Sequence, residues 1–433
     1  MEPQKKIRVG LLGMGTVGTG VVSLLQQNGD LVEKRSGCSV SVEKILVRDV
    51  SRRRGIELPA ETFTSDPSDI LENPEIDLVV ELLGGMEPAR SYLEKALRAG
   101  KGVVTANKDV IATHGKELLD IARENNCNIW FEGSVGGGIP LLRPLKNCLA
   151  ANRIEKLVGV VNGTTNFILT RMDQEGSSFE EALREAQDLG FAEADPSSDV
   201  DGWDAAYKII ILGGLAFGTF VPLEQVYVQG INGISFRDLQ YARELGYTIK
   251  LVAVGDTVDG QVSLRVQPTL LPLDHPLAAV YHEYNALFLE GDAVGEVMFY
   301  GKGAGASPTA SAVMGDVIEA ARSKLHSIDS STLGVQLSDR AVLPMGDMVS
   351  NFYLRLQAYD RPGVFAALAS TFGENQVSLD MIIQKRSEEG KAEIVLITHS
   401  VKESYFWEAL EKVSNLPAID EVHSVFRVIE NNE

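Results

Sequence analysis

A single lysine stands where an acidic loop gives way to an aliphatic run. The stretch FAEADPSSDVDGWDAAYKIIIL, residues 191–212, places Asp204 four positions before Lys208 and surrounds that lysine with apolar side chains. This spacing is compatible with an exposed ion pair, which stabilises a helix by roughly 0.2–0.5 kcal/mol. The apolar neighbours instead indicate a buried helix, where a lysine needs a partner or a chemical role. Lys208 is therefore a candidate for chemistry.

The aspartates of this stretch also have the spacing of a calcium-binding loop. An EF-hand loop that began at residue 197 would place Asp199, Asp201 and Gly202 at its third, fifth and sixth positions. Its twelfth position, which must supply a bidentate glutamate, would then be Lys208. A cationic side chain at a liganding position excludes that kind of site.

The acidic residues before Lys208 suit a substrate that carries an ammonium group. Carboxylates in the loop can hold the ammonium, and the lysine can exchange a proton with the reacting atom. The residues concerned are Glu193, Asp195, Asp199 and Asp201 in the loop, with Asp204 and Lys208 on one helical face. A second turn, NGTTN at 162–166, follows an expected strand. Its amides and hydroxyls suit an anion, and an ordinary helix N-cap explains them equally well.

The elements that must position these residues begin with a glycine-rich turn. IRVGLL at 7–12 is an expected strand, and GMGTVG at 13–18 opens an expected helix. Gly13 permits a tight turn, Gly15 lets the backbone approach a pyrophosphate, and Gly18 lets the helix pack on the strand. Further strands are expected within 39–47, 75–85, 100–108 and 127–138. Strands that alternate with helices predict an α/β fold with a Rossmann-like, doubly wound parallel sheet.

The tip of the second strand bears on the choice of cofactor. It reads VRDVSRRR at 47–54, where NAD-specific proteins carry an acidic residue for the ribose hydroxyls. Arg48, Arg52 and Arg53 can hold a 2′-phosphate, and Asp49 can still reach a ribose. The pattern favours NADP and leaves NAD possible, with a solvated basic loop as the alternative.

Composition and charge exclude several classes of protein. The chain has 433 residues, a formal net charge of −20 and three scattered cysteines. The charge argues against a nucleic-acid partner, and the cysteine spacing suggests neither a disulfide framework nor a zinc site. We expect no membrane segment and a cytoplasmic protein.

The last part of the chain has its own pattern of strands and helices. The order βαββαβ over 348–433 predicts a ferredoxin-like plait. With DRPGV at 360–364 it resembles an ACT domain, a family of amino-acid-sensing modules. That resemblance implies feedback control by an amino acid such as threonine, with Asp360 and Gly363 near the effector and strands pairing across a subunit interface. A purely dimerising tail is the alternative. We expect removal of this module to leave activity and abolish the response.

Five motifs together resemble the homoserine dehydrogenases. They are GMGTVG, TANK at 105–108, EGSVGGGIP at 132–140, VNGTTNFI at 161–168 and GFAEADPSSDVDGWDAAYK at 190–208. The resemblance implies interconversion of L-homoserine and L-aspartate 4-semialdehyde with a nicotinamide cofactor. It also implies a homodimer or homotetramer. The expected domains are 1–140 for the cofactor, with a chain return at about 301–322, then 141–300 for substrate and dimerisation, a linker at 323–347, and 348–433.

The resemblance also implies a role for each matching residue. Lys208 would be the acid/base, with Asp204 beside it. Glu193, Asp199, Thr164 and Lys108 would bind substrate. The cofactor would contact Gly13, Gly15, Thr16, Val17, Gly18, Thr105, Lys108 and Gly303, together with Arg48, Arg52 and Arg53. The 132–140 loop is similar to the family's monovalent-cation loop, which implies sodium held by Glu132 and by the carbonyls of Val135, Gly137 and Ile139, with an ordinary turn as the alternative.

Two other functions compete with this one. A non-catalytic, nucleotide-binding amino-acid sensor would keep the glycine turn and the tail but would have lost Lys208 or Asp204. An aspartate-semialdehyde dehydrogenase would need a thiol nucleophile, and neither Cys127 nor Cys148 has a histidine close in sequence. Lys208 and Asp204 are both present, so a homoserine dehydrogenase is the leading hypothesis.

Overall fold

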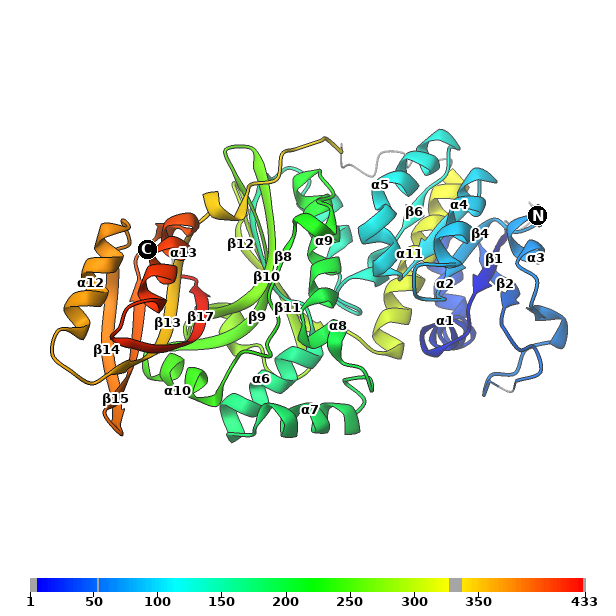
Figure 1. Cartoon of the computed structure of the whole chain (residues 1–433). Helices are drawn as coiled ribbons and strands as arrows, with labels where there is room; N and C mark the ends of the chain where they lie inside the picture. Colours follow the sequence, from blue (N-terminus) through cyan, green and yellow to red (C-terminus); the bar gives the residue numbers. More distant parts are fainter. Residues whose placement is uncertain (1–5, 53, 327–336, 431–433) are drawn as a thin grey trace. The chain divides into compact units, whose positions relative to one another are not determined.

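The computed structural model of the chain describes residues 6–52, 54–326 and 337–430 (Figure 1). The chain divides into two compact units, each assembled from segments that are distant in sequence. The first unit comprises Met1–Glu155, Tyr207–Leu223 and Leu289–Asp339, and the second comprises Lys156–Ala206, Glu224–Phe288 and Arg340–Glu433.

The first unit is built on a parallel sheet, which confirms the predicted Rossmann-like fold. All of the pairings recorded in this sheet are parallel. The strand order in the described part of the chain is β3-β2-β1-β4-β5-β6. The strands are β1 (Lys6–Leu12), β2 (Ser39–Leu46), β3 (Phe63–Thr64), β4 (Leu78–Glu81), β5 (Gly102–Thr105) and β6 (Ile129–Trp130).

Helices cover the two faces of this sheet because side chains alternate along its strands. On β1, Ile7, Val9 and Leu11 share one core with α1 (Thr16–Gln27) and α11 (Ala306–His326). Gly10 faces the other side, where a side chain would lie 2.5 Å from Ile70 of α3 (Ser68–Leu71). The other helices of the unit include α2 (Gly29–Ser36), α4 (Ala89–Arg98) and α5 (Lys108–Glu124).

Helix α11 brings a late segment of the chain back to this sheet. It contacts α1 and α2 and contributes Ala310, Val313 and Val317 to their shared core (Figure 1). The helix continues to His326, so it includes the first four residues of the stretch that we expected to be a linker. Residues 327–336 of that stretch lie outside the described residues.

A second, mixed sheet carries the rest of the chain. Its core is the long antiparallel pair β9 (Tyr247–Val258) and β10 (Gln261–Pro272). The main strand order among the described residues is β12-β11-β7-β9-β10-β17-β13-β15-β14. The strands before residue 303 also include β7 (Ile154–Val160), β8 (Tyr227–Val228), β11 (Tyr284–Gly291) and β12 (Gly295–Lys302). Strands β11 and β12 form a hairpin, and Gly295 turns the chain at the start of β12 with φ +70°.

Helices α6 (Gly163–Glu175), α7 (Phe179–Asp188) and α10 (Phe236–Glu244) belong to the second unit. Helix α6 contacts α7, α10 and β9. Its first turn lies at the carboxyl end of β7, where the sequence placed the NGTTN turn.

The tail module, defined here as residues 349–430, has the predicted βαββαβ order. Its elements are β13 (Val349–Tyr359), α12 (Val364–Glu374), β14 (Leu379–Glu388), β15 (Lys391–Thr398), the short β16 (Val401–Lys402), α13 (Glu403–Ser414) and β17 (Ile419–Val428). Even-numbered residues of β13, such as Phe352 and Leu354, pack with α12 and α13. Strand β17 pairs in parallel with β10 through Thr269 and Leu270. The module is thus joined to the neighbouring sheet by backbone hydrogen bonds.

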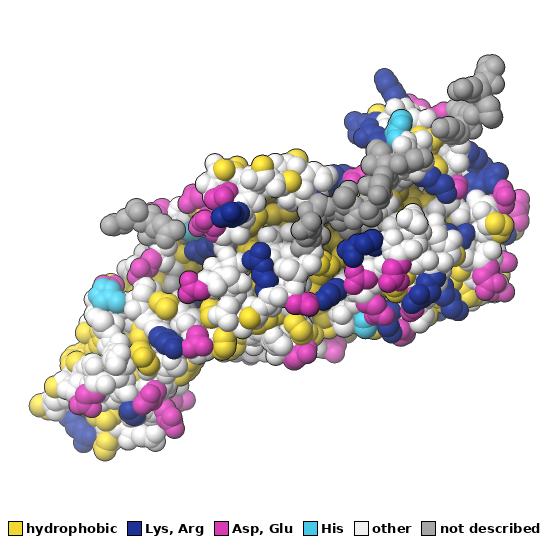
Figure 2. All heavy atoms as spheres, turned by 90° about the horizontal axis from the view of Figure 1, so that it is seen from above, with side chains coloured by type: hydrophobic (Ala, Val, Ile, Leu, Met, Phe, Trp, Pro, Cys, Tyr) yellow, Lys and Arg dark blue, Asp and Glu magenta, His cyan; other side chains and the backbone are white. Residues whose placement is uncertain are grey.

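The surface of the described residues mixes both signs of charge. Lysine and arginine side chains are interspersed with aspartate and glutamate on the face seen in Figure 2. Among the helices that the structure describes, none combines the length and the apolar character needed to cross a membrane.

Candidate active site

The glycine turn between β1 and α1 is shaped for close approach of a ligand. Gly13 adopts φ +98°, and its N–H donates to the Leu46 carbonyl at 3.0 Å. A side chain at Gly18 would lie 2.4 Å from the Gly13 carbonyl oxygen, so both glycines are required by the fold. Gly15 is different, because none of the described residues has an atom within 4 Å of the position that its Cβ would take. Open space over this backbone, at the start of α1 where Thr16 and Val17 lie, fits a bound dinucleotide pyrophosphate.

The basic loop after β2 leaves arginines in solvent. Arg48 and Arg52 are exposed, and Arg53 lies outside the described residues. Arg54, which the sequence reasoning did not single out, holds the loop by donating to the carbonyls of Arg52 and Asp49. The Asp49 carboxylate accepts from the Ser51 hydroxyl at 2.6 Å and from its N–H at 2.9 Å, which lowers the pKa of Asp49.

The TANK turn is anchored by a buried carboxylate. The Thr105 hydroxyl donates to Glu81 at 2.6 Å, and Glu81 also accepts from the Leu83 N–H at 2.7 Å. Burial raises the pKa of Glu81 above its usual value, although these hydrogen bonds oppose the shift. Asn107 caps α5, so Lys108 begins the helix with its side chain about one-third exposed and 3.8 Å from Asp109.

The predicted cation loop uses its glutamate to organise backbone amides. The Glu132 carboxylate accepts from the N–H groups of Leu141 at 2.7 Å, Leu142 at 3.0 Å and Arg143 at 2.7 Å. Val135 and Ile139 are buried. Gly137 has φ +53°, and a side chain there would lie 2.5 Å from the carbonyl oxygen of Gly303, so the backbone at Gly303 lies against this loop. Within the described residues no group of three or more His, Cys, Asp or Glu residues is arranged to hold a metal.

The NGTTN turn gathers two of the candidate carboxylates. The Asn162 side-chain amide donates to Asp199 at 2.6 Å and to Asp204 at 2.8 Å. Its Oδ1 accepts from the Thr165 N–H at 2.8 Å, so the same side chain caps α6. The sequence left anion binding and N-capping open for this turn, and the structure shows the cap together with a carboxylate bridge. The local sequence around Asn162 gave no signal for that bridge, because Asp199 and Asp204 both lie far from Asn162 along the chain.

The other residues of the acidic loop are placed differently. The Thr164 hydroxyl donates to the Phe191 carbonyl at 2.7 Å and thereby ties α6 to the start of the loop. Asp199 lies on the short helix α8 (Ser197–Val200). Glu193 is exposed, and its backbone carbonyl accepts from Gln187 at 3.1 Å.

Helix α9 (Trp203–Phe217) carries Asp204 and Lys208 one turn apart. The sequence-based expectation of a buried helix is confirmed, since Asp204 is 8% exposed and Lys208 is 9% exposed. Gly202 precedes the helix with φ +91°, a conformation that favours glycine and sets where α9 begins.

The tail module contains a cavity of about 250 Å³ beside the start of α12. Both residues suggested for effector binding, Asp360 and Gly363, line it. Gly363 adopts φ +91° and directly precedes α12, and Gln384 donates to Asp360 at 3.5 Å. Tyr359, Ala392 and Ile394 line the same cavity, which we call the Gly363 cavity.

Comparison with known proteins identifies the family. The chain is 46% identical to the homoserine dehydrogenase of Bacillus subtilis over 427 residues, which is 98% of each chain. The chain belongs to the homoserine dehydrogenase family. A homoserine dehydrogenase of Synechocystis is also 46% identical, over 98% of this chain and 99% of that protein. Family profiles agree: "Homoserine dehydrogenase, NAD binding domain" matches residues 13–132, "Homoserine dehydrogenase" matches 140–318, and "ACT domain" matches 352–417.

Solved structures of homoserine dehydrogenases share the fold. One from Thiobacillus denitrificans has a TM-score of 0.92 and 39% identity, and the match covers 98% of this chain and 99% of that one. A hyperthermophilic archaeal homoserine dehydrogenase in complex with NADPH has a TM-score of 0.62 and 30% identity over 73% of this chain and 98% of that one. The chain is therefore an NAD(P)-dependent oxidoreductase with a homoserine dehydrogenase fold and a C-terminal ACT domain.

Proposed function

We propose that this enzyme interconverts L-homoserine and L-aspartate 4-semialdehyde, with Lys208 as the proton donor and acceptor. The proposal rests on the bridge from Asn162, which holds Asp204 at the start of α9, the helix that carries Lys208, and holds Asp199 on the preceding helix α8. A bound nicotinamide supplies or accepts the hydride. In the reductive direction the former aldehyde oxygen gains negative charge, and a lysine ammonium can stabilise that charge and deliver a proton.

The acidic loop suits recognition of the amino-acid end of the substrate. Glu193 and Asp199 can accept hydrogen bonds from an ammonium group, and the first turn of α6 around Thr164 offers backbone N–H groups to a carboxylate. Lys108 opens α5 directly after the TANK turn, and we assign it to the region of the nicotinamide and substrate.

We infer a preference for NADP over NAD. Arg48 and Arg52 are exposed and available to a 2′-phosphate, whereas the Asp49 carboxylate already accepts two hydrogen bonds from Ser51. For a monovalent cation such as sodium, the carbonyls of Val135, Gly137 and Ile139 are the better candidates. The Glu132 carboxylate is engaged by three backbone amides.

We assign the Gly363 cavity to an amino-acid effector, with L-threonine as the first candidate. Its volume of about 250 Å³ suits a small amino acid, and Asp360 can bind an ammonium group. Among the described strands β14 ends the sheet order, so its outer edge is suited to pair with a second copy of the chain in a homodimer or homotetramer.

The test is the oxidation of NADPH or NADH in the presence of L-aspartate 4-semialdehyde, with and without L-threonine. We expect semialdehyde-dependent oxidation, faster with NADPH, that threonine slows. A well-folded protein that binds NADPH and turns over with neither cofactor would contradict the proposed reaction. A faster rate with NADH would contradict only the cofactor assignment.

A further inference from the structure

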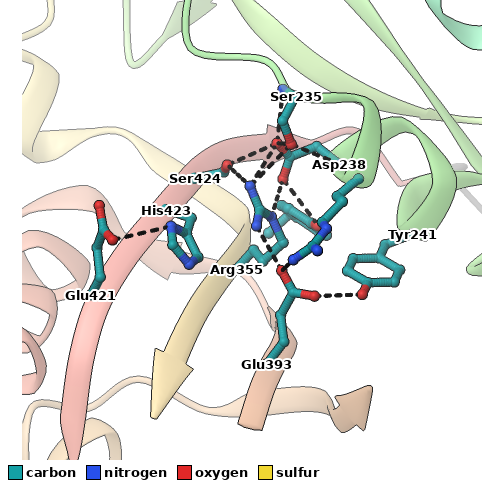
Figure 3. A network of polar contacts seen from close by, with 10 residues as sticks. Ser235, Asp238, Tyr241, Arg355, Glu393, Glu421, His423 and Ser424 are labelled. Carbon is teal, nitrogen blue, oxygen red and sulfur yellow. Dashed lines mark hydrogen bonds and ion pairs between the residues drawn. The ribbon is translucent and has the colours of Figure 1, made fainter. Parts of the chain in front are cut away.

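A buried ion-pair network fastens the tail module to helix α10. Arg355 of β13 donates to Asp238 through Nε at 2.7 Å and to Glu393 of β15 through Nη1 at 2.7 Å. These three side chains are almost completely buried. Figure 3 shows them converging from the two sides of the junction, with Ser235, Tyr241 and Ser424 around them. We call these six residues the Arg355 network.

The network leaves few of its polar groups without a partner. Asp238 accepts from the Ser235 hydroxyl at 2.6 Å and from the Ser424 hydroxyl at 2.9 Å. Glu393 accepts from the Tyr241 hydroxyl at 2.5 Å. Burial raises the pKa of Glu393, but the hydrogen bonds from Tyr241 and Arg355 outweigh it, and the pKa lies below its usual value. Loss of one member of such a buried charged cluster is strongly destabilising. The network therefore holds α10 and the tail module together, and we refer to it as a joint between them.

One end of this joint reaches the Gly363 cavity. On β15, Ala392 and Ile394 line the cavity, and Glu393 between them points to the opposite face of the sheet. On β13, Tyr359 lines the cavity, and Arg355 lies four residues earlier on the same strand. A ligand that shifts either strand therefore acts on a residue that carries part of the Arg355 network.

The other end reaches the substrate half of the site. Asp238 lies in the first turn of α10, whose far end carries Arg243 and Glu244. Arg243 donates to Asp173 of α6 at 2.7 Å, and Phe236 packs against Gly176, the C-cap of α6. The opposite end of α6 is the turn in which Asn162 holds Asp199 and Asp204. These contacts form a continuous path from α10 through α6 to that turn.

We propose that the Arg355 network is the joint through which occupancy of the Gly363 cavity alters the substrate half of the active site. The inference rests on the proposed function, because it takes the cavity to be the effector site. It differs from a merely structural role, in which the network would hold the tail module in place without carrying the response.

The test compares Arg355→Lys with a matched variant in the full chain. Lysine keeps the charge and loses the fork that binds Asp238 and Glu393 together. Arg427→Lys is the control, because Arg427 forms an equally buried two-point contact at 2.7 Å with Glu403 of α13 rather than with α10. For both variants we would measure L-threonine binding by calorimetry and the ratio of rates with and without L-threonine.

We expect Arg355→Lys to bind threonine with a Kd within about threefold of the wild-type value. The threonine concentration that halves its rate should rise by about tenfold. Arg427→Lys should keep its inhibition. Inhibition of Arg355→Lys that matches wild type would overturn the proposal.

A second measurement does not depend on the identity of the effector. Amide hydrogen exchange without threonine should be faster in α10 and α6 of Arg355→Lys and unchanged there in Arg427→Lys. Unchanged exchange in α6 of Arg355→Lys would also overturn the proposal. If wild-type enzyme neither binds nor responds to threonine, the effector assignment and the proposed coupling both fail, whereas a threonine response that persists in Arg355→Lys overturns the coupling alone.

Discussion

At the scale of single residues, Asn162 combines two functions in one side chain. Its oxygen caps α6 and its amide bridges Asp199 and Asp204. Asn162→Ala removes both, whereas Asn162→Ser keeps a capping oxygen and removes the amide. We expect the alanine variant to lose about 1 kcal/mol of unfolding free energy and the serine variant clearly less. Both should lose about tenfold or more in kcat/KM, because Asp199 and the buried Asp204 lose the amide that holds them together. Urea unfolding and steady-state kinetics test this, and a fully active serine variant would refute the bridge.

Substitution of Lys208 tests whether this lysine takes part in proton transfer. Lys208→Met should lower kcat by about 10²- to 10⁴-fold, the usual contribution of a general acid or base, with the Kd for NADPH unchanged. Lys116→Met removes an exposed ion pair with Asp339 and should have almost no effect. Single-turnover rates and fluorescence titration of NADPH provide the two readouts. Normal turnover in Lys208→Met would leave Lys208 with a structural role in the buried helix and no part in proton transfer.

Lys250 of β9 gives the enzyme a pH-dependent stability. It is 2% exposed and donates to the Asn166 side chain at 3.0 Å and the Val280 carbonyl at 2.6 Å. Burial lowers its pKa to about 8, and the charge of Asp173 only partly opposes this shift. In the unfolded chain the pKa is about 10.4. Between these values the unfolded state binds more protons, so unfolding free energy rises with pH.

The comparison variant for this effect is Lys250→Met. The difference in unfolding free energy, wild type minus variant, should increase from about pH 7 to about pH 9.5. It should stay flat below about pH 7, where lysine is protonated in both states. Urea titrations of the two proteins at each pH measure the difference, and a difference that falls with pH would contradict the assignment.

At the scale of residues, the sequence predicted properties that depend on residues nearby in the chain, such as the burial of a side chain. The burial of Asp204 and Lys208 followed from the apolar residues of their own helix. The Asn162 bridge and the Glu81 contact to Thr105 join side chains from separate elements, and no local pattern encodes such a contact. The choice between helix cap and ligand site at the NGTTN turn stayed open for the same reason.

At the scale of elements, the turn after β1 separates fold from ligand binding. A side chain at Gly18 would lie 2.4 Å from a backbone oxygen, whereas one at Gly15 would meet no atom of the described chain within 4 Å. Gly18→Ala should therefore destabilise the cofactor-free protein by about 1–3 kcal/mol. Gly15→Ala should leave unfolding unchanged and weaken NADPH by about tenfold or more, because the methyl group fills the open space over the backbone. Calorimetric unfolding and NADPH titration distinguish the two, and equal NADPH affinity in Gly15→Ala would show that no cofactor lies there.

The elements were predictable where periodicity was strong. Alternating strands and helices predicted the parallel sheet, and the βαββαβ order predicted the tail module. The turn of the β11–β12 hairpin carries Gly291, Asp292 and Gly295, which are residue types typical of turns. Helix α11 extends past the predicted boundary, since helix ends depend on tertiary contacts that the sequence does not display.

At the scale of the whole molecule, the sequence described the tail as separable, and the pairing of β10 with β17 argues against that. Strand β17 pairs with β10 through Arg427 and Val428, and Ile429 donates to the Leu270 carbonyl at 3.0 Å. Such pairing joins residues far apart in the chain, so composition and motif boundaries cannot reveal it. The expectation that removal of the module leaves activity therefore needs revision.

We expect a chain that ends at residue 347 to be unstable. Loss of the tail module exposes the edge of β10 at Thr269 and Leu270, and an unpaired apolar edge promotes association with other chains. Asp238 and Tyr241 also lose their partners on the tail module. The truncated protein should unfold about 5 °C or more below the full chain and elute in part as aggregate. Calorimetry and size-exclusion chromatography test this. Arg355→Lys keeps the β10–β17 pairing and should remain free of aggregate. A truncated protein that is monodisperse and has the full-length Tm would show that the β10–β17 pairing contributes little to stability.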